Sequence, residues 1–568
     1  MDQSYFRHQS DSRYCFSLDE HRTKVRLAVA RRAKIGKVEL VYGDEFRFAE
    51  TRKAIPMEIR HEDLDYCYYE AIMEAKIPRF FYIFHIESEE GSFDLYESGL
   101  TQSGFDYSLA FLSAFRHNGE NRIDIVSPNP KLHGKIAYQI FPERFARGKE
   151  KKDDRYINRP WDAKGDQLHR GAFLGGDLYG VIEHLDYLSS LNVGAIYLTP
   201  IHPSPSNHKY DVLDYFDVDP AFGGKEALRL LVEECHKRGI ALIMDLVFNH
   251  CSVRHPFFED VKKRGMESPY YSWFMIDGNR PKYPPLNYRC FSYAPIMPKL
   301  DTSSKAVQDY LIEVGKYWVK EFHIDGFRLD VSDAVSHYFW TRFKIAMREL
   351  DPHFFLLGEN WLNAESFLGE TQLDGVMNYP FLGVVGSYLL GQNDAETTHF
   401  KLDGLLMRYK DGNDENMFNV LASHDIQRFL NLCQGDKDLA LLGYAIMMFY
   451  IGIPMIYYGE EILMEGGGDP DCRRGMDWGK ANHPDEYAAF FAELMRLRAD
   501  SLFKEGALSI SAENGLLKMR RGEGKNALTL LLNAGKEAVS LPKAGKGILW
   551  RNIDGDTLLP KGILIYRG

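Results

Sequence analysis

Between residues 136 and 457 the chain alternates short, mostly apolar runs with longer stretches whose apolar residues recur at helical spacing. One such stretch carries Leu178, Val181, Ile182, Leu185 and Leu188, after a possible cap at Asp177. The short runs are residues 136–141, 195–199, 241–247, 326–330, 354–359, 375–378, 418–423 and 455–457. Apolar strands separated by helices form parallel sheets covered on both faces, and eight such units predict an α/β fold with a (β/α)8 TIM barrel.

The two ends of the chain have a different pattern, with short β-rich runs separated by charged or glycine-containing turns. We expect an N-terminal β-sandwich over residues 1–125, a barrel domain over 131–504 and a small C-terminal β-domain over 505–568. One connection in the barrel is long: about fifty residues, 251–302, separate the third strand from the next helix. Long loops in compact domains are usually functional, so an inserted subdomain that overhangs the site is expected.

Residues 439–459 carry no charge and are long enough to cross a bilayer. However, Gly452 and Pro454 interrupt the segment, and proline disrupts a helix interior. We therefore expect a buried helix over 439–450 followed by a buried strand over 455–457, and no membrane span.

The composition limits the partners. The formal net charge is −12, which makes nucleic acid or an anionic membrane surface an improbable partner and suits a neutral substrate. The seven cysteines are widely spaced without a CxxC pair, a pattern that argues against disulfides or structural zinc. With no basic and apolar leader at residue 1, a cytoplasmic location is expected.

Three acids stand at the ends of predicted strands: Asp330, Glu359 and Asp425. A buried strand has little use for a carboxylate, and the C-terminal ends of barrel strands open onto the face that carries active sites. Taken singly, Asp330 could cap a helix and Glu359 could be a buried ion-pair partner. The ordered set is hard to explain as independent caps.

Four segments, residues 245–250 (DLVFNH), 326–330 (GFRLD), 358–361 (GENW) and 423–425 (SHD), resemble in order and spacing the motifs of the α-amylase family of glycoside hydrolases. Residues 297–301 (MPKLD), 207–211 (NHKYD) and 467–473 (GGDPDCR) are similar to its cyclomaltodextrinase, neopullulanase and maltogenic amylase subgroup. The resemblance covers residues 135–505.

The resemblance implies the chemistry of the three acids. Asp330 would be the nucleophile, Glu359 the general acid and then base, and Asp425 would stabilise the transition state, as retaining glycosidases require. Arg328 would keep Asp330 ionised, and Leu356, Leu357 and Trp361 would give Glu359 an apolar setting. The residues implied to bind substrate are His208, Tyr210, His250, Arg328, Trp361, His424, Asp469 and Arg473. Asp245 and Asn249 would brace the site.

The family's usual calcium loop is altered here. Phe141–Phe145 is present, but the following loop carries Arg147, Lys149 and Lys152, which cannot ligate a cation that needs six to eight oxygens. We expect no calcium and no other cofactor, with a lysine paired to the leftover acids Asp153, Asp154 and Asp177. Asn360 and Asp301 also depart from the subgroup and leave linkage and acceptor preference open.

The resemblance implies a retaining α-glucan hydrolase that cleaves cyclodextrins and maltooligosaccharides, with pullulan and starch as further candidates and some transglycosylation. It also implies a homodimer formed through the N-terminal domain. The alternatives are an α-1,6-glucosidase or dedicated transglycosylase, and a catalytically silent glucan-binding protein. The silent protein would be expected to have lost one of the three acids.

Overall fold

The computed structural model describes residues 1–74, 79–103, 113–149, 156–541 and 547–568. The chain divides into two compact units, residues 1–127 with 395–414, and residues 128–394 with 415–568. Lys152, Asp153 and Asp154 lie outside the described residues. Among the described residues, no helix is both long and apolar enough to cross a membrane.

The first unit contains two antiparallel sheets, as expected for a β-sandwich. One sheet has the strand order β1-β3-β7-β6, with β2 beside β3, and the other has the order β10-β9-β8-β4-β5, with β11 beside β8. The strands are β1 (Phe6–Arg7), β2 (Cys15–Ser17), β3 (Arg22–Ala30), β4 (Ile35–Asp44), β5 (Lys53–Pro56), β6 (Glu58–Glu62), β7 (Tyr66–Glu74), β8 (Phe80–Ser88), β9 (Gly91–Tyr96), β10 (Gly99–Gln102) and β11 (Phe115–His117). Apolar side chains from both sheets, such as Leu27 and Phe84, form one core because alternate residues of a strand face the same side.

Helix α11 (Ala395–Leu406) and the start of α12 (Asp411–Asn416) belong to this first unit. A charged cluster holds them: Arg26 is ion-paired with Glu70 (2.6 Å) and with Asp411, and Lys24 lies 2.6 Å from Asp411. Arg26 is 2% exposed, and a guanidinium this deeply buried needs such partners.

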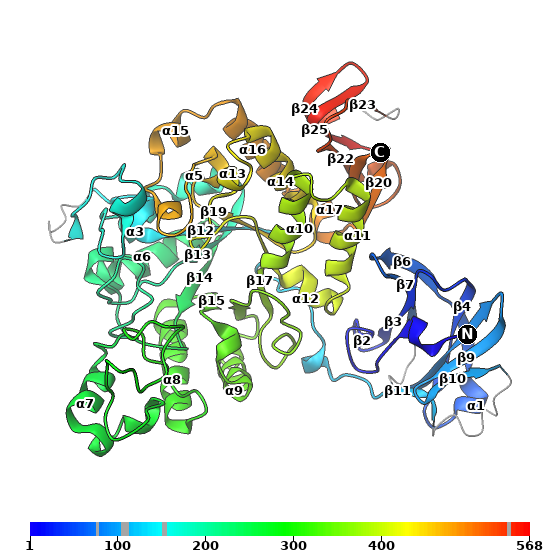
Figure 1. Cartoon of the computed structure of the whole chain (residues 1–568), viewed down its shortest axis with the longest axis horizontal. Helices are drawn as coiled ribbons and strands as arrows, with labels where there is room; N and C mark the ends of the chain where they lie inside the picture. Colours follow the sequence, from blue (N-terminus) through cyan, green and yellow to red (C-terminus); the bar gives the residue numbers. More distant parts are fainter. Residues whose placement is uncertain (75–78, 104–112, 150–155, 542–546) are drawn as a thin grey trace. The chain divides into compact units, whose positions relative to one another are not determined.

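The second unit is built on a closed barrel of parallel strands, which confirms the predicted fold class (Figure 1). The strands are β12 (Ile136–Ile140), β13 (Val193–Leu198), β14 (Ala241–Leu246), β15 (Gly326–Leu329), β16 (Phe355–Gly358), β17 (Gly375–Asn378), β18 (Phe418–Val420) and β19 (Ile453–Tyr457). Their interior is filled by apolar side chains, among them Tyr197, Leu357 and Met377. The barrel interior is thus a packed core, and functional side chains can lie only at its rim.

Helices cover the barrel where the apolar spacing predicts them. They are α4 (Leu178–Glu183), α5 (Leu185–Ser190), α6 (Gly224–Lys237), α8 (Lys305–Phe322), α9 (His337–Arg348), α10 (Tyr379–Leu389), α13 (Phe429–Leu432), α14 (Lys437–Phe449), α16 (Glu486–Leu497) and α17 (Leu502–Glu505). The stripe expected as one helix is two, α4 and α5, joined at His184. The uncharged segment after Leu439 is the buried helix α14 followed by β19, as predicted.

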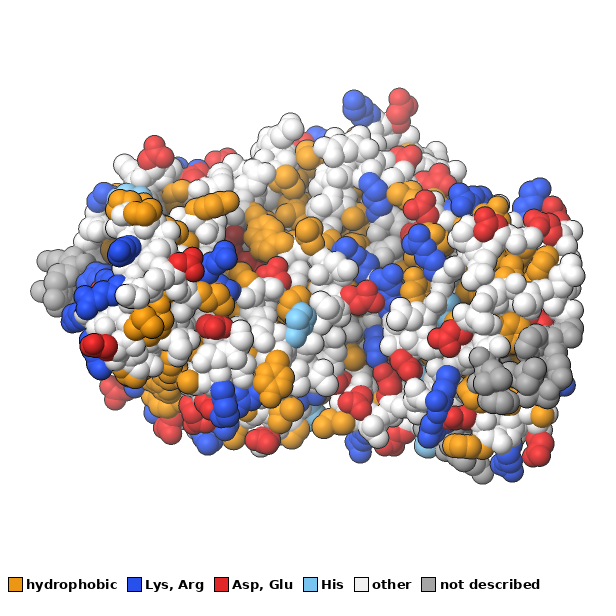
Figure 2. All heavy atoms as spheres, turned by 60° about the horizontal axis from the view of Figure 1, so that its bottom comes forward, with side chains coloured by type: hydrophobic (Ala, Val, Ile, Leu, Met, Phe, Trp, Pro, Cys, Tyr) orange, Lys and Arg blue, Asp and Glu red, His pale blue; other side chains and the backbone are white. Residues whose placement is uncertain are grey.

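The inserted segment after β14 contains α7 (Pro256–Arg264) and connects back to the barrel through bridges such as His250 with Lys299. The C-terminal residues form an antiparallel sheet of β20 (Leu508–Glu513), β21 (Leu516–Arg521), β22 (Leu528–Asn533), β23 (Val539–Ser540), β24 (Gly547–Asp554) and β25 (Thr557–Arg567). On the face seen in Figure 2, acidic and basic side chains are interspersed.

Candidate active site

The three strand-end acids line one cavity of about 520 Å³. Asp330 directly follows β15, Glu359 directly follows β16, and Asp425 lies in the loop after β18. Because all barrel strands run parallel, these ends meet on the same rim. The expected convergence of the three carboxyl groups is therefore present.

Most of the residues expected to bind substrate line the same cavity. The lining includes His208, Tyr210, His250, Trp361, Asp469 and Arg473. Arg328 and His424 do not line it; both are buried beneath it and contact residues that do.

Arg328 holds the first two acids with one guanidinium. Its Nη1 lies 3.1 Å from Oδ1 of Asp330, and its Nη2 lies 2.8 Å from Oε2 of Glu359. Nη1 is also 2.9 Å from Oδ2 of Asp245, the residue opposite Arg328 in the register of β14 with β15. The strand pairing thus sets an arginine between three carboxylates, and its rigid fork fixes their separation.

Asp245 braces this arrangement and does not itself line the cavity. Tyr197 Oη donates to it at 2.7 Å and Tyr210 Oη at 3.0 Å. Complete burial raises the pKa of Asp245 to about 6, against the opposing effect of Arg328. Asp245 therefore orients both Arg328 and the Tyr210 ring.

The surroundings of Glu359 differ from the apolar setting expected from the sequence. Trp361 Nε1 donates to Oε1 at 3.1 Å, and the main-chain N–H of Val331 donates to Oε2 at 3.0 Å. Leu357 faces the barrel interior and packs in its core. The contact expected to be apolar at Trp361 is instead polar, because the indole reaches Glu359 with its N–H edge.

Asp330 is almost fully buried among other acids. Burial, together with the nearby Glu359 carboxylate, raises the pKa of Asp330 well above its usual value, and Arg328 opposes this shift. Its Oδ2 atom has no hydrogen-bond partner among the described residues. Asp330 itself lines the cavity, so its carboxyl group lies where a bound substrate would contact it.

The three histidines of the site are neutral, because burial lowers the pKa of His208 and of His250 to about 3 each and that of His424 well below its usual value. Gln139 Nε2 donates to Nδ1 of His424 at 2.8 Å. Nε2 of His424 then carries the proton, 2.6 Å from Tyr210 Oη and 3.2 Å from Asp425 Oδ2. His424 can donate without carrying charge.

Asp425 and Asp469 share one arginine. Arg473 Nη2 lies 3.3 Å from Oδ1 of Asp425, and its Nη1 lies 3.0 Å from Oδ1 of Asp469. Arg473 Nε also donates to the carbonyl of His424 at 2.7 Å. The third acid is thereby held by a second arginine, separate from Arg328.

Four further lining residues were given no role from the sequence, although Met297 belongs to the MPKLD segment: Phe291, Met297, Val331 and Asp333. Phe291 belongs to the inserted segment and stacks on His250 with ring centroids 5.0 Å apart. The aromatic composition of residues 251–302 was a signal, but it could not identify which ring reaches the site. Asp333 lies three residues after Asp330, where sequence alone does not show on which side the turn places it.

Known families match this chain along most of its length. The family described as alpha amylase, catalytic domain, matches residues 139–502, and the alpha amylase N-terminal ig-like domain matches residues 1–108. The chain belongs to the α-amylase family. It is therefore a glycoside hydrolase, and the resemblance drawn from its motifs is confirmed.

Individual relatives of this α-amylase family chain are similar over nearly all of its length. A maltogenic alpha-amylase of Bacillus acidopullulyticus is 34% identical over 94% of this chain and 92% of its own. Neopullulanase 2 of Thermoactinomyces vulgaris is 36% identical over 86% of this chain and 83% of its own. A solved cyclomaltodextrinase superposes with a TM-score of 0.90 at 31% identity, covering 100% of this chain and 98% of that one.

The loop after α3 (Pro142–Phe145) bears on calcium, the ion commonly bound there in this α-amylase subgroup. Arg147 Nε donates to the main-chain carbonyl of Leu174 at 2.7 Å. Oδ1 of Asp177 accepts from Gly180 N at 2.7 Å, as the cap of α4, and from Gly148 N at 3.0 Å. These two oxygens are thus held by N–H groups, whereas Asp153 and Asp154 lie outside the described residues, so the absence of calcium stays a prediction.

The expected pairing of a loop lysine with the leftover acids stays a prediction, because Lys152, Asp153 and Asp154 lie outside the described residues. Lys149 Nζ lies 3.9 Å from Glu183 Oε2, and its main-chain N–H donates to Oε1 of the same residue at 3.1 Å. Its partner is therefore an acid of α4 that the sequence analysis did not name.

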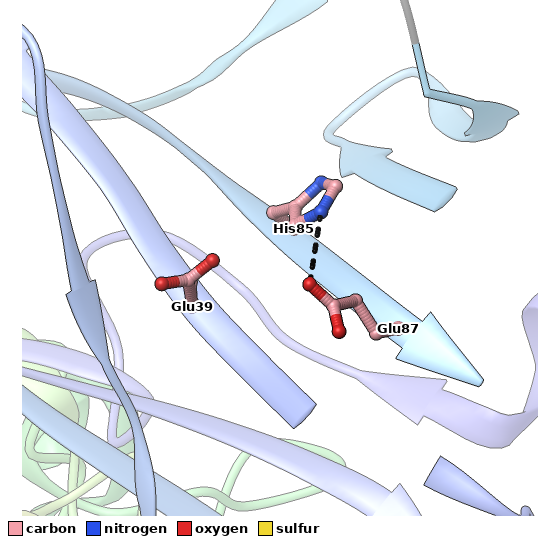
Figure 3. Close-up of side chains that lie close together, drawn as sticks. All are labelled: Glu39, His85 and Glu87. Atoms are coloured by element: carbon pink, nitrogen blue, oxygen red, sulfur yellow. Dashed lines mark ion pairs between the residues drawn. The ribbon is translucent and has the colours of Figure 1, made fainter. Parts of the chain in front are cut away.

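A separate group of potential metal ligands, Glu39, His85 and Glu87, lies on the paired strands β4 and β8 (Figure 3). Lys37 Nζ is 3.0 Å from Glu39 and 3.9 Å from Glu87. The lysine already offsets the charge of both carboxylates, so the cluster does not need a metal cation to neutralise it.

Proposed function

We propose that this α-amylase family enzyme is a retaining α-glucan hydrolase that cleaves α-1,4 bonds in cyclodextrins and maltooligosaccharides, with pullulan and starch as further substrates. The observation that carries the proposal is Arg328, which holds the carboxyl groups of Asp330 and Glu359 together in one cavity. The names of the similar proteins, cyclomaltodextrinase, maltogenic amylase and neopullulanase, support the substrate class.

In the first step, a carboxylate oxygen of Asp330 attacks the anomeric carbon of the bound glucose unit. Glu359 gives its proton to the glycosidic oxygen as that bond breaks, and a covalent glycosyl ester on Asp330 remains. Arg328 stabilises the negative charge that passes between the two carboxylates. Asp425 and neutral His424 hold hydroxyl groups of the same unit while positive charge develops on its ring.

In the second step, Glu359 takes a proton from a water molecule that attacks the anomeric carbon, and the ester bond to Asp330 breaks. Two displacements restore the original configuration. If the hydroxyl group of another sugar replaces the water, the result is transglycosylation. Trp361, which is 43% exposed beside Glu359, offers a ring face where such an acceptor can stack.

The decisive test is Asp330→Asn, with hydrolysis of β-cyclodextrin as the measurement. We expect the rate to fall by at least about 10³-fold, since the nucleophile is lost. Asp19→Asn is the matched control, because Asp19 does not line the cavity and pairs with Arg22 where both side chains are exposed. Wild-type activity in Asp330→Asn would exclude this mechanism. Proton NMR of the first product distinguishes retention from inversion, and product analysis on cyclodextrin, pullulan and starch ranks the substrates.

We further propose that the enzyme works without calcium, self-associates through its N-terminal domain and resides in the cytoplasm. Ile59 on β6 and Ile72 on β7 are 47% and 40% exposed, and exposed apolar side chains on adjacent strands support an interface. The described cysteines are all unpaired, which suits a reducing compartment. Light scattering after size-exclusion chromatography should give the mass of a dimer, and Ile59→Lys with Ile72→Lys should give that of a monomer.

A further inference from the structure

A second cavity, of about 640 Å³, lies in the barrel unit and shares no lining residue with the catalytic cavity. Its walls come from the loop after α3, from residues 161–164, and from the segment that leads into α15 (Trp478–Asn482). A volume of this size is typical of small-molecule sites. The catalytic mechanism makes no use of it.

A short turn separates the two cavities. Arg473 lines the catalytic cavity, and the next residue, Arg474, lines the second one. Asp471 fixes this turn: its carboxylate accepts from the main-chain N–H groups of Gly165 at 2.7 Å and Gly467 at 2.8 Å, and from Arg474 Nε at 2.9 Å. These three hydrogen bonds fix the turn that separates the two cavities.

Two tryptophans line the second cavity, Trp161 and Trp478. The indole N–H of Trp161 donates to the carbonyl of Met476 at 2.9 Å, and that of Trp478 donates to the carbonyl of Phe145 at 2.7 Å. Both polar edges are therefore used inside the protein. What the rings offer to the cavity is apolar surface, held in place before any ligand arrives.

The packing around each ring supports this arrangement. A Cβ atom on Gly475 would lie 2.5 Å from the carbonyl of Trp161 and 2.9 Å from its indole, so glycine is needed for the chain to pass so close. His184 stacks on Trp478 with centroids 3.7 Å apart. The fold thus keeps both tryptophans at the wall of the cavity.

The charges around the cavity are of both signs. Asp162, Glu465 and Asp477 line it together with Arg147, Lys164, Arg474 and Lys480. Arg474 is engaged by Asp471, and Arg147 donates to a carbonyl and lies over the Trp161 ring. Since much of the positive charge is already satisfied, the cavity suits a neutral ligand with many hydroxyl groups better than an anion.

We propose that this cavity is a second α-glucan-binding site, in which a short glucan segment stacks on Trp161 and Trp478 and hydrogen-bonds to the charged rim. The ligand class rests on the proposed function, and the site goes beyond it. Its position behind the Asp471 turn lets a long glucan be held near the catalytic cavity without occupying it.

The test is isothermal titration calorimetry with maltotriose on the Asp330→Asn enzyme, which keeps the substrate intact. We expect two classes of site, and we expect Trp161→Ala in the same background to weaken one of them by about tenfold or more. Trp550→Ala is the matched control, since Trp550 is 58% exposed in the C-terminal sheet and lines neither cavity. If Trp161→Ala unfolds the chain, Trp161→Leu removes the aromatic plane while keeping an apolar side chain.

A single class of site in Asp330→Asn, or two undiminished classes after loss of the Trp161 ring, would overturn the inference. The wild-type background separates this outcome from a failure of the proposed function. Trp161→Ala should retain full activity on maltotriose and lose activity on amylose, whereas an error in the proposed function would leave wild type inactive on both. Equal activity of Trp161→Ala and wild type on amylose would also contradict the site.

Discussion

The indole N–H of Trp361 lies 3.1 Å from Oε1 of Glu359. The same ring stacks on Tyr379 with centroids 3.9 Å apart and planes 2° from parallel. Tyr379 thus fixes the ring, and the ring fixes the carboxyl group that the proposed mechanism uses as acid and base.

Trp361→Phe tests this relationship, because phenylalanine keeps the stacking on Tyr379 and removes only the N–H. We expect kcat on β-cyclodextrin to fall about tenfold, the scale of one hydrogen bond to a charged group, with an unchanged melting temperature. Steady-state kinetics and calorimetry measure both, with Trp550→Phe as the control. An unchanged kcat would mean that Arg328 and Val331 alone position Glu359.

Arg328→Lys should impair catalysis and alter its pH dependence. Lysine cannot bridge two carboxylates with a planar fork, so we expect kcat/KM to fall by about 100-fold or more. Burial and Glu359 raise the pKa of Asp330, and Arg328 opposes them. With that opposition weakened, Asp330 protonates at a higher pH.

The nucleophile must be ionised, so activity is lost as the pH falls through the pKa of Asp330. The acid limb of the kcat/KM profile should therefore lie above the usual range of an aspartate in the wild type, and move further upward in Arg328→Lys. If the acid limb of the Arg328→Lys profile lies at the same pH as in the wild type, the limb reports the titration of a group other than Asp330.

Asp411→Asn tests how residues 395–414 are held in the first unit. Arg26 and Lys24, against the effect of burial, lower the pKa of Asp411 to about 2. A lowered carboxyl pKa stabilises the folded state above the unfolded-state value near 3.8 and loses this contribution as the pH falls toward 2. At pH 7 we expect the variant to lose about 1 kcal/mol, because the Asp411 side chain is 36% exposed and solvent screens its ion pairs, and because Glu70 still faces Arg26.

Thermal unfolding of wild type and Asp411→Asn between pH 7 and pH 3 measures this effect. The difference in melting temperature should be largest at pH 7 and narrow below about pH 4. Asp19→Asn, at a pair in which both side chains are exposed, is the control. A difference independent of pH would show that the charge of Asp411 does not contribute.

Calcium should leave stability unchanged. Calorimetry in chelator and in millimolar calcium is expected to give melting temperatures within about 1 °C, since only an ion that binds the folded state shifts the equilibrium. Arg147→Asn, which frees the Leu174 carbonyl and adds an oxygen ligand, is an informative comparison. A calcium-dependent rise of more than about 3 °C in the melting temperature of wild type would contradict the proposal that the enzyme binds no calcium.

Much of the barrel could be predicted from local patterns. The uncharged stretch after Leu439 resolves into α14 and β19 as expected, because an apolar run broken at Gly452 and Pro454 has few other solutions. The division of one expected helix into α4 and α5 at His184 could not be predicted. A brief loss of helical geometry leaves the apolar spacing of the sequence intact.

The sequence alone determined the alternation of elements, the three acids at strand ends and the family, because these depend on residue type and on spacing along one short segment. The tertiary structure decided that Trp361 gives Glu359 a polar contact instead of an apolar one, that residues 395–414 belong to the first unit, and that Arg473 and Arg474 line different cavities. The reason is physical: the direction and partner of a side chain in a turn are set by packing against segments far away in the chain, and no local periodicity encodes that packing.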